Sequence, residues 1–312
     1  MTGPIVILGY GAVGRPTAQA LLARGERVRI AQRSPLVDPP AGADYVACDV
    51  LDADSVRRAV AGASQVVLAV GFAYDSRLWR TVWPKAMTNV VEACAAAGAR
   101  LVFLDNLYQL GPQTAPRRED MPLTDVGEKP AILAQVTRIW MAAVEAGRVR
   151  VAALRCSDFY GPGVVTSHLG SEAFGRLAAG KTALLLAPAD TPHDFAYVPD
   201  IARALVTLLD APDDAFGQVW NMPCAPTRTP RAILRLGAEA VGARLRLLAV
   251  PLWLTAALAP LSRMLKEIID VGFTWDRPYV VDASKFTARF WSDVTPFEVG
   301  APATLQSFAA GR

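Results

Sequence analysis

Residues 5–14 read IVILGYGAVG, four apolar residues that lead directly into glycines at positions 9, 11 and 14. The apolar run predicts a buried strand, and the Ala- and Leu-rich residues 15–24 that follow predict a helix. Each glycine has its own physical use: a tight turn, an open approach to the backbone, and close packing of helix on strand. The stretch therefore predicts a strand, turn and helix whose helix N-terminus can bind a pyrophosphate, as in a dinucleotide-binding loop.

The same alternation of strand and helix continues through the first half of the chain. Parallel strands need crossover helices and become buried on both faces, which matches strand runs without polar alternation. We therefore predict an α/β fold: a Rossmann-type doubly wound parallel sheet with a smaller C-terminal α+β substrate-binding region. The further predicted strands are 28–31, 44–47, 66–70, 100–104 and 149–154. The predicted domains are a dinucleotide-binding domain, 1–155, to which 194–222 returns, and a substrate-binding region, 156–193 with 223–312.

Composition excludes several classes of function. The 312 residues are 52% hydrophobic and carry a net charge of +3 without a basic stripe, which argues against nucleic acid as a partner. The four cysteines lie far apart and form no CxxC pair, so we expect no metal site and buried thiols in a reducing cytoplasm. The apolar stretch 247–261 is shorter than the roughly 20 residues of a membrane span, so we expect a buried or lid-forming helix and no stable membrane insertion.

The predicted cofactor loop consists of Gly9, Gly11, Ala12, Val13 and Gly14. The second strand ends at Gln32 and Arg33, where an NAD-binding protein usually has a carboxylate that accepts the ribose hydroxyls. A guanidinium can instead pair with a 2′-phosphate, so Arg33 favours NADP(H) over NAD(H). The alternative is a solvated surface arginine. The other predicted cofactor contacts end the third and fourth strands: Asp49, Val50, Ala69, Val70 and Gly71.

Further motifs along the chain resemble one family. They are CDVLD (48–52), TNVVEACAAAGARLVFLDN (88–106), LRCSDFYGPG (154–163), HDFAYVPDIARAL (193–205), GQVWNMP (217–223) and VVDASKF (280–286). In their order and spacing they resemble the extended short-chain dehydrogenases/reductases, or NAD-dependent epimerase/dehydratase family. The resemblance implies an enzyme with a small-molecule substrate. It also implies that Ser157 lines the nicotinamide and that Asp158 lines the substrate.

The chain departs from this family at the positions that carry the chemistry. Members normally use a Tyr-x-x-x-Lys pair, yet none of the seven tyrosines has a lysine four residues later. Asn106 occupies the place of the family's serine or threonine. His193 stands where nucleotide-sugar members have an arginine that binds the diphosphate, and a neutral imidazole cannot replace a guanidinium there. The sequence therefore disfavours a nucleotide-sugar substrate and leaves His193 as a substrate contact or a proton carrier.

Asp105, Asn106 and Tyr108 follow the fifth predicted strand, at the edge where open α/β sheets bind their ligands. A phenol can donate a proton to a carbonyl oxygen that receives hydride, so Tyr108 is the candidate acid. Lys129 is a candidate cation beside it if the intervening loop folds back. The structural alternatives are a packing role for the Tyr108 ring and an Asx turn at Asn106.

Three functions remain open from the sequence. The first is an NADP(H)-dependent oxidoreductase that acts on a carbonyl or alcohol of a small, fairly apolar metabolite. The second is an epimerase or dehydratase that retains its cofactor, and the third is a non-catalytic dinucleotide-binding sensor. The oligomeric state is also open, with a homodimer as one candidate.

Overall fold

The computed structural model describes residues 3–36 and 38–310, which form two compact units. The first unit contains the described residues of 1–105 together with 131–155 and 201–220. The second contains 106–130, 156–200 and the described residues of 221–312. The predicted partition assigns 106–130 to the dinucleotide-binding domain, whereas these units group it with the second.

The first unit is built on a seven-stranded sheet of order β10-β6-β5-β4-β1-β2-β3. Its neighbouring pairs from β6 to β3 are parallel, and Ile5 of β1 lies opposite Val28 of β2 and Gln65 of β4. The predicted α/β class with a Rossmann-type parallel sheet is confirmed. The strands are β1 (Ile5–Leu8), β2 (Val28–Gln32), β3 (Ala43–Ala47), β4 (Gln65–Leu68), β5 (Arg100–Asp105), β6 (Val151–Arg155) and β10 (Gln218–Asn221).

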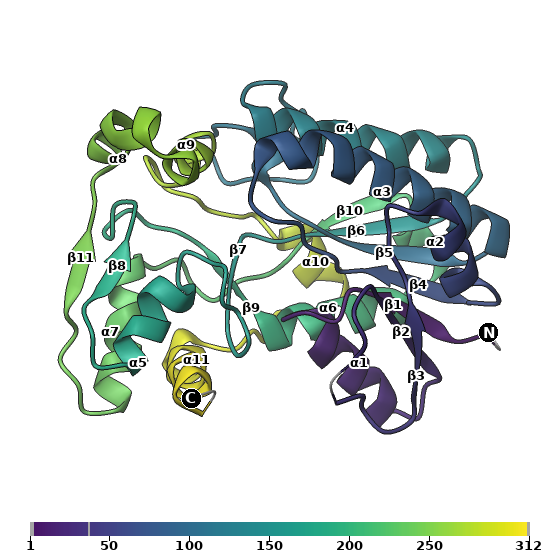
Figure 1. The fold of residues 1–312 in the computed structure, drawn as a ribbon, viewed down its shortest axis with the longest axis horizontal. Coiled ribbons are helices and arrows are strands. Elements are labelled where there is room, and N and C mark those ends of the chain that lie inside the picture. The colour runs from purple at the N-terminus through teal and green to yellow at the C-terminus, as the bar shows by residue number, and fades with distance from the viewer. Residues whose placement is uncertain (1–2, 37, 311–312) are drawn as a thin grey trace. The chain divides into compact units, whose positions relative to one another are not determined.

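Helices cover both faces of this sheet, which explains why the middle positions of its inner strands are mostly apolar. Figure 1 shows α2, α3 and α4 on one face and α1 and α6 on the other. All four residues of β1 and all four of β4 are buried. The helices are α1 (Gly14–Ala23), α2 (Ala53–Val60), α3 (Ser76–Ala97), α4 (Glu128–Glu145), α6 (Val198–Asp210) and the short η3 (Asp213–Ala215).

Local sequence signals set the ends of these helices. The Asp75 carboxylate accepts hydrogen bonds from the backbone N–H groups of Arg77 and Leu78 and so caps α3. Gly98 ends the same helix in the left-handed conformation, with φ of 65°, which glycine adopts without steric cost. The buried Arg100 at the start of β5 donates to the carbonyls of Leu209 and Ala211, and thereby fastens the end of α6 to the sheet.

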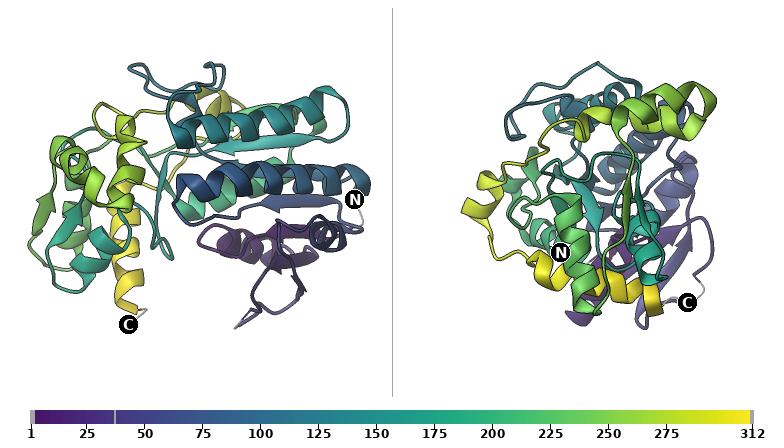
Figure 2. Two further views of the ribbon diagram at one scale, coloured as in Figure 1. Left: turned by 45° about the horizontal axis from the view of Figure 1, so that its top comes forward. Right: turned by 90° about the vertical axis from the view of Figure 1, so that its left-hand side faces the viewer.

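The second unit combines short strands with helices. Its two small sheets pair β7 with β9 and β8 with β11, both in parallel. Helix α11 packs against α7, as Figures 1 and 2 show. The elements are η1 (Tyr108–Leu110), β7 (Asp158–Tyr160), η2 (Gly170–Gly175), α5 (Arg176–Ala178), β8 (Ala183–Leu185), β9 (Phe195–Tyr197), α7 (Pro230–Ala240), β11 (Leu247–Ala249), α8 (Leu252–Leu258), η4 (Ala259–Leu261), α9 (Arg263–Ile269), η5 (Gly272–Thr274), α10 (Ser284–Arg289) and α11 (Phe297–Ala310).

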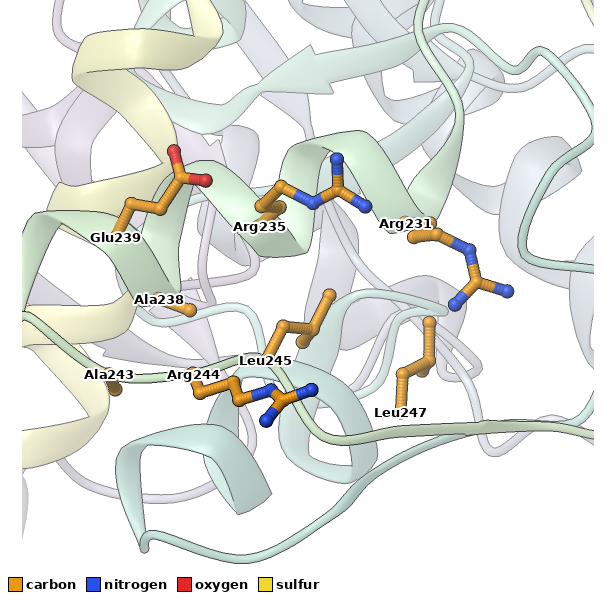
Figure 3. A pocket seen from close by; sticks show the side chains of 8 residues that line it. All are labelled: Arg231, Arg235, Ala238, Glu239, Ala243, Arg244, Leu245 and Leu247. Atoms are coloured by element: carbon orange, nitrogen blue, oxygen red, sulfur yellow. The ribbon is translucent and has the colours of Figure 1, made fainter.

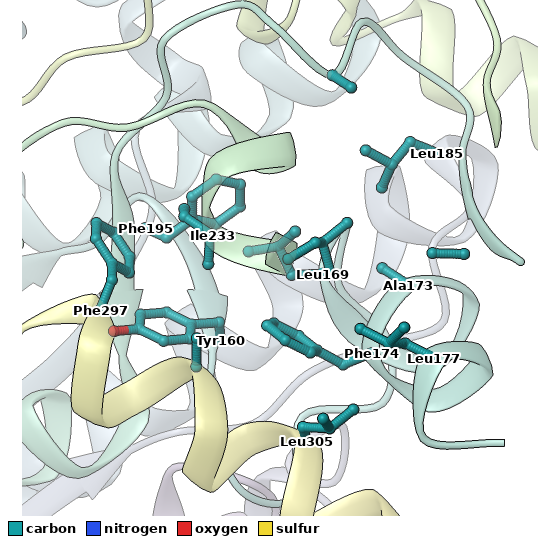
Figure 4. Close-up of a cluster of buried hydrophobic side chains, with 14 of the residues drawn as sticks. Tyr160, Leu169, Ala173, Phe174, Leu177, Leu185, Phe195, Ile233, Phe297 and Leu305 are labelled. Carbon is teal, nitrogen blue, oxygen red and sulfur yellow. The ribbon is translucent and has the colours of Figure 1, made fainter. Parts of the chain in front are cut away.

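The core of the second unit is aromatic and aliphatic. Tyr160 packs its ring against Phe297, with 5.3 Å between the ring centroids, and Phe174 and Leu305 lie in the same buried cluster (Figure 4). Burying such side chains contributes about 1.5–3 kcal/mol each to the stability of this core.

The apolar stretch 247–261 does not form the single buried or lid-forming helix that its sequence predicts. It forms β11, α8 and η4 in succession, and Trp253 and Leu261 expose 71% and 85% of their surface. The expectation of burial is wrong for these side chains, because the two prolines divide the stretch into elements too short to bury a continuous face. Within residues 3–36 and 38–310, no helix is long and apolar enough to cross a membrane.

Candidate active site

The glycine loop that follows β1 has the geometry of a dinucleotide cradle. Gly9 has φ of +97°, and a Cβ there would lie 2.8 Å from the Ala69 carbonyl oxygen. A Cβ on Gly14 would lie 1.9 Å from the Gly9 oxygen. Gly11 is different, since nothing lies within 4 Å of the position of its Cβ. The outer two glycines are therefore required by packing, and the middle one keeps a space open beside the loop.

The N-terminus of α1 is suited to a phosphate. Val13 precedes the helix, no side chain caps it, and its first turn contains no acidic residue. Ala12 is half-buried and Val13 is buried. Both side chains are apolar, so neither places a polar group at this end. Unpaired N–H groups and the helix dipole favour an anion at such a terminus. The loop of residues 9–14 therefore fits a dinucleotide pyrophosphate.

The neighbouring strand ends carry the other predicted cofactor contacts. Arg33 directly follows β2, is exposed, and has no ion pair with any residue that the structure describes. Asp49 forms an Asx turn, because its Oδ1 accepts from the Leu51 N–H at 2.9 Å. Val50 is buried, and its carbonyl accepts from Asn89 Nδ2 at 2.9 Å. Ala69, Val70 and Gly71 form the irregular segment after β4.

The polar residues after β5 separate into two kinds. The Asp105 carboxylate is buried and pairs with Arg155 across the β5–β6 ladder, 3.2 Å from Nε to Oδ2. Its role is to neutralise a buried guanidinium, so the expectation that it faces a ligand is wrong. Asn106 forms an Asx turn in which Oδ1 accepts from the Tyr108 N–H at 3.0 Å. This turn sets the position of Tyr108 at the start of η1.

The second unit brings Tyr108, Asp158 and His193 together. The Tyr108 hydroxyl lies 3.5 Å from Asp158 Oδ1, at the outer limit of a hydrogen bond. Asp158 Oδ2 lies 3.0 Å from His193 Nε2. Strand β7 begins at Asp158, which pairs opposite Phe195 of β9, two residues after the histidine. The three residues come from distant parts of the sequence, so only the fold makes them neighbours.

His193 is held inside a column of stacked rings. Its ring lies between those of Trp275 and Tyr279, with centroid distances of 4.0 and 4.7 Å and interplanar angles of 6° and 11°. His168 stacks on Trp275 at 3.7 Å, and the Arg117 guanidinium lies 3.6 Å from the centre of the Tyr279 ring. His193 has no exposed surface. Stacking and burial therefore fix the ring in one orientation.

Lys129 and Ser157 have partners of their own. The Lys129 ammonium is fully buried and bonds to the Glu267 carboxylate, and Asp270 Oδ2 lies 3.8 Å away. Ser157 is buried with its Oγ 3.4 Å from Cys224 Sγ. The structure thus places Lys129 in a carboxylate pocket formed by α9 and the residue after it. Its catalytic role, like the cofactor role of Ser157, stays a prediction.

Sequence reasoning missed the residues that surround His193. Trp275, Tyr279 and Arg117 carry no motif, and the Thr274 carbonyl that meets the histidine ring is a backbone group. The sequence gives no signal for Tyr279 or Arg117, since Arg117 stands in the charged run PRRED (116–120) and Tyr279 follows DRP (276–278). Both are buried, with 1% and 0% of their surface exposed.

A cavity that the structure outlines lies away from these residues. It measures about 410 Å³ and opens beside α7 and the segment before β11 (Figure 3). Arg231, Arg235 and Arg244 line it, and Arg231 already binds Asp190 through two hydrogen bonds. None of the predicted site residues lines this cavity. The candidate chemical groups are therefore those of Tyr108, Asp158 and His193. In the described part of the chain no group of His, Cys, Asp and Glu side chains could hold a metal ion.

Comparison with known proteins identifies the family. The model of the NAD dependent epimerase/dehydratase family matches residues 5–222. The chain belongs to this family. It is therefore an enzyme of the NAD(P)-dependent short-chain dehydrogenase type, as the motifs predict, and an oxidoreductase with a Rossmann-type cofactor domain.

Individual relatives agree with this assignment. A dTDP-6-deoxy-L-talose 4-dehydrogenase (NAD(P)(+)) of Kitasatospora kifunensis is 29% identical over 263 residues, which cover 79% of this chain and 81% of the relative. The structure of Thermus thermophilus UDP-glucose 4-epimerase with NAD is 21% identical with a TM-score of 0.77, covering 99% of this chain and 100% of that one. Bacillus cereus UDP-glucuronic acid 4-epimerase has a TM-score of 0.80 at 14% identity, covering 99% and 100% of the two chains. The two structures show that the fold is shared.

Proposed function

We propose that this chain is an NADP(H)-dependent oxidoreductase that interconverts a carbonyl and an alcohol on a small, fairly apolar metabolite. The glycine loop is the observation that supports a dinucleotide cofactor, because Gly9 and Gly14 are closely packed while the space at Gly11 stays open. Arg33 supports the choice of NADP(H), because it is an exposed cation without an ion pair among the described residues. A 2′-phosphate would supply its counter-charge.

Tyr108 is the proposed proton donor. When bound, the nicotinamide supplies the hydride, and the protein must protonate the oxygen of the reduced carbonyl. Tyr108 is half-buried, and its hydroxyl is already directed at the Asp158 carboxylate. A positioned phenol can deliver its proton to an oxygen in reach, which contributes roughly 10²–10⁴ to the rate. In the oxidation direction the same oxygen would take the proton from the alcohol.

Burial of His193 supports an apolar substrate. The position that resembles a diphosphate-binding arginine is here a fully buried ring stacked between two others. Such a ring has no exposed surface with which to contact a diphosphate. The four free cysteines suit a reducing compartment, so we also propose a cytoplasmic location.

A nucleotide sugar is the second candidate substrate. It is favoured by the Kitasatospora kifunensis relative, whose name specifies a dTDP-6-deoxy sugar. On this reading the chain would be a dehydrogenase or a cofactor-retaining epimerase or dehydratase, and the diphosphate would be bound by residues other than His193.

The experiment is a turnover assay with purified protein. NADPH oxidation is followed with a panel of apolar ketones and aldehydes, and NADP⁺ reduction is followed with dTDP- and UDP-hexoses. We expect steady turnover of at least one apolar carbonyl compound, and loss of it in Tyr108→Phe. Turnover of nucleotide sugars alone would select the second candidate. Tight NADPH binding without any turnover would contradict the proposal.

A further inference from the structure

The ring nitrogens of His193 meet two acceptors. Nδ1 lies 3.1 Å from the Thr274 carbonyl oxygen, and Nε2 lies 3.0 Å from Asp158 Oδ2. A carbonyl oxygen can only accept, so Nδ1 must carry a proton and donate it to Thr274. A neutral imidazole has one N–H, so Nε2 would then present a lone pair to a carboxylate oxygen.

That arrangement is stable only if the His193–Asp158 pair holds one more proton. Two lone pairs at 3.0 Å repel, and no other described group satisfies His193 Nε2 or Asp158 Oδ2. The N–H direction at Nε2 is not aligned with Oδ2, so the contact is a close charge pair rather than a straight hydrogen bond. With that proton on Nε2, the ring donates from both nitrogens and faces the carboxylate as its counter-charge.

The titratable groups around the His193–Asp158 pair favour one proton shared by these two residues. The neighbouring His168 is neutral at neutral pH, because burial lowers its pKa to about 3. Arg117 lies over Tyr279 on the other side of the histidine, and burial lowers the pKa of its guanidinium. Asp194, next in the chain, accepts from the Val281 N–H, and burial raises the pKa of its carboxyl group. Asp158 is the nearest carboxylate to the ring.

Asp158 connects this shared proton to Tyr108. Its Oδ1 lies 3.5 Å from the Tyr108 hydroxyl, and its side chain is 18% exposed whereas that of His193 is fully buried. We propose that Tyr108, Asp158 and His193 form a proton relay that replaces the missing Tyr-x-x-x-Lys pair. This inference rests on the proposed role of Tyr108 as proton donor. Tyr108 is the catalytic residue. Asp158 and His193 are positioning residues that return a proton to it.

Each bond that the relay breaks is matched by a bond that it forms. In reduction, hydride goes to the carbonyl carbon and the Tyr108 O–H bond breaks, so that its proton protonates the carbonyl oxygen and a phenolate is left. The Asp158 carboxyl group, which is partly exposed, first tilts so that Oδ2 meets the Nε2–H, and the His193 proton then moves from Nε2 to Oδ2. The carboxyl group then turns about its Cβ–Cγ bond, a soft two-fold torsion, and protonates the phenolate. Solvent returns one proton to the pair, and oxidation runs the same steps in reverse.

The decisive measurement is the protonation of His193 in the complete protein. The chain has two histidines, so ¹⁵N-histidine labelling gives two sets of ring signals, which His168→Gln assigns. We expect both ring nitrogens of His193 to carry protons at neutral pH. In Asp158→Asn we expect Nε2 to lose its proton while Nδ1 keeps its own. A wild-type Nε2 without a proton overturns the relay.

This measurement needs neither cofactor nor substrate, so it can fail while the proposed oxidoreductase function stands. A second arm uses NADPH turnover with the carbonyl compound found in the panel. Asp158→Asn should lower turnover by roughly 10²–10⁴ in the wild-type background and have no further effect in Tyr108→Phe. Asp210→Asn, which removes an exposed pair with Arg24, should leave turnover unchanged. Equal losses in both backgrounds would show that Asp158 acts independently of Tyr108 and overturn the relay.

Discussion

Gly14 packs against the carbonyl group of Gly9 so closely that a Cβ on Gly14 would lie 1.9 Å from the Gly9 oxygen. This contact holds the start of α1 against the turn that follows β1. It is a packing requirement within the first unit, and it is separate from the open space beside Gly11. The two kinds of glycine should therefore respond differently to substitution.

Gly11→Val should abolish NADPH binding and leave the protein folded. Nothing in the structure lies within 4 Å of the added Cβ, yet the side chain would occupy the approach of the pyrophosphate. Fluorescence titration with NADPH and circular dichroism measure the two effects. Gly14→Ala is the matched contrast, and it should destabilise the fold by on the order of 1–3 kcal/mol or more, because the backbone must move. Wild-type affinity in Gly11→Val would mean that the loop is only a turn.

Arg33→Ala should weaken NADPH binding and leave NADH binding nearly unchanged. Loss of a charged hydrogen bond to a phosphate costs about 1.5–3 kcal/mol, which corresponds to a tenfold to hundredfold rise in Kd for NADPH. Titration with both cofactors measures the ratio. Arg57→Ala is a suitable control, since this exposed arginine pairs with Asp54 on α2. If both cofactors bind Arg33→Ala as they bind wild type, the NADP(H) preference has no basis in this residue.

Tyr108→Phe should keep the stability of the protein and lose its turnover. The ring is retained and only the half-buried hydroxyl is removed, so the free energy of unfolding should change by no more than about 0.5 kcal/mol. Turnover should fall by roughly 10²–10⁴. Thermal unfolding and an NADPH assay measure the two quantities. A packing role predicts the reverse: Phe would behave as wild type, and only Tyr108→Ala would be impaired, through the cavity it leaves.

Lys129→Met tests the remaining catalytic candidate. The Glu267 carboxylate, with 6% of its surface exposed, would lose its buried partner, so the variant should be destabilised by roughly 3–5 kcal/mol. The double variant Lys129→Met/Glu267→Leu should recover most of that loss, because it removes the buried Glu267 carboxylate together with its partner. Chemical denaturation measures both. A Lys129→Met protein of normal stability but without activity would instead support the catalytic role.

The fold and the cofactor loop were accessible to sequence reasoning because their signals are local. The run 5–14 contains its own strand, turn and helix start, and the glycines at 9 and 14 meet atoms of adjacent segments. Asn106 and Tyr108 were accessible for the same reason, since an Asx turn spans two residues. The buried pairing of Asp105 with Arg155 was not, because it depends on the register of two strands that are 50 residues apart.

What the sequence by itself determined is therefore the family, the parallel sheet, the dinucleotide loop and the absence of a Tyr-x-x-x-Lys pair. Each depends on residue types at short or regular spacing. Only the tertiary structure decided that Asp158 lies between Tyr108 and His193, and that Lys129 is paired with Glu267. These contacts join segments 35 to 138 residues apart, and their electrostatics depend on burial, which local sequence does not encode.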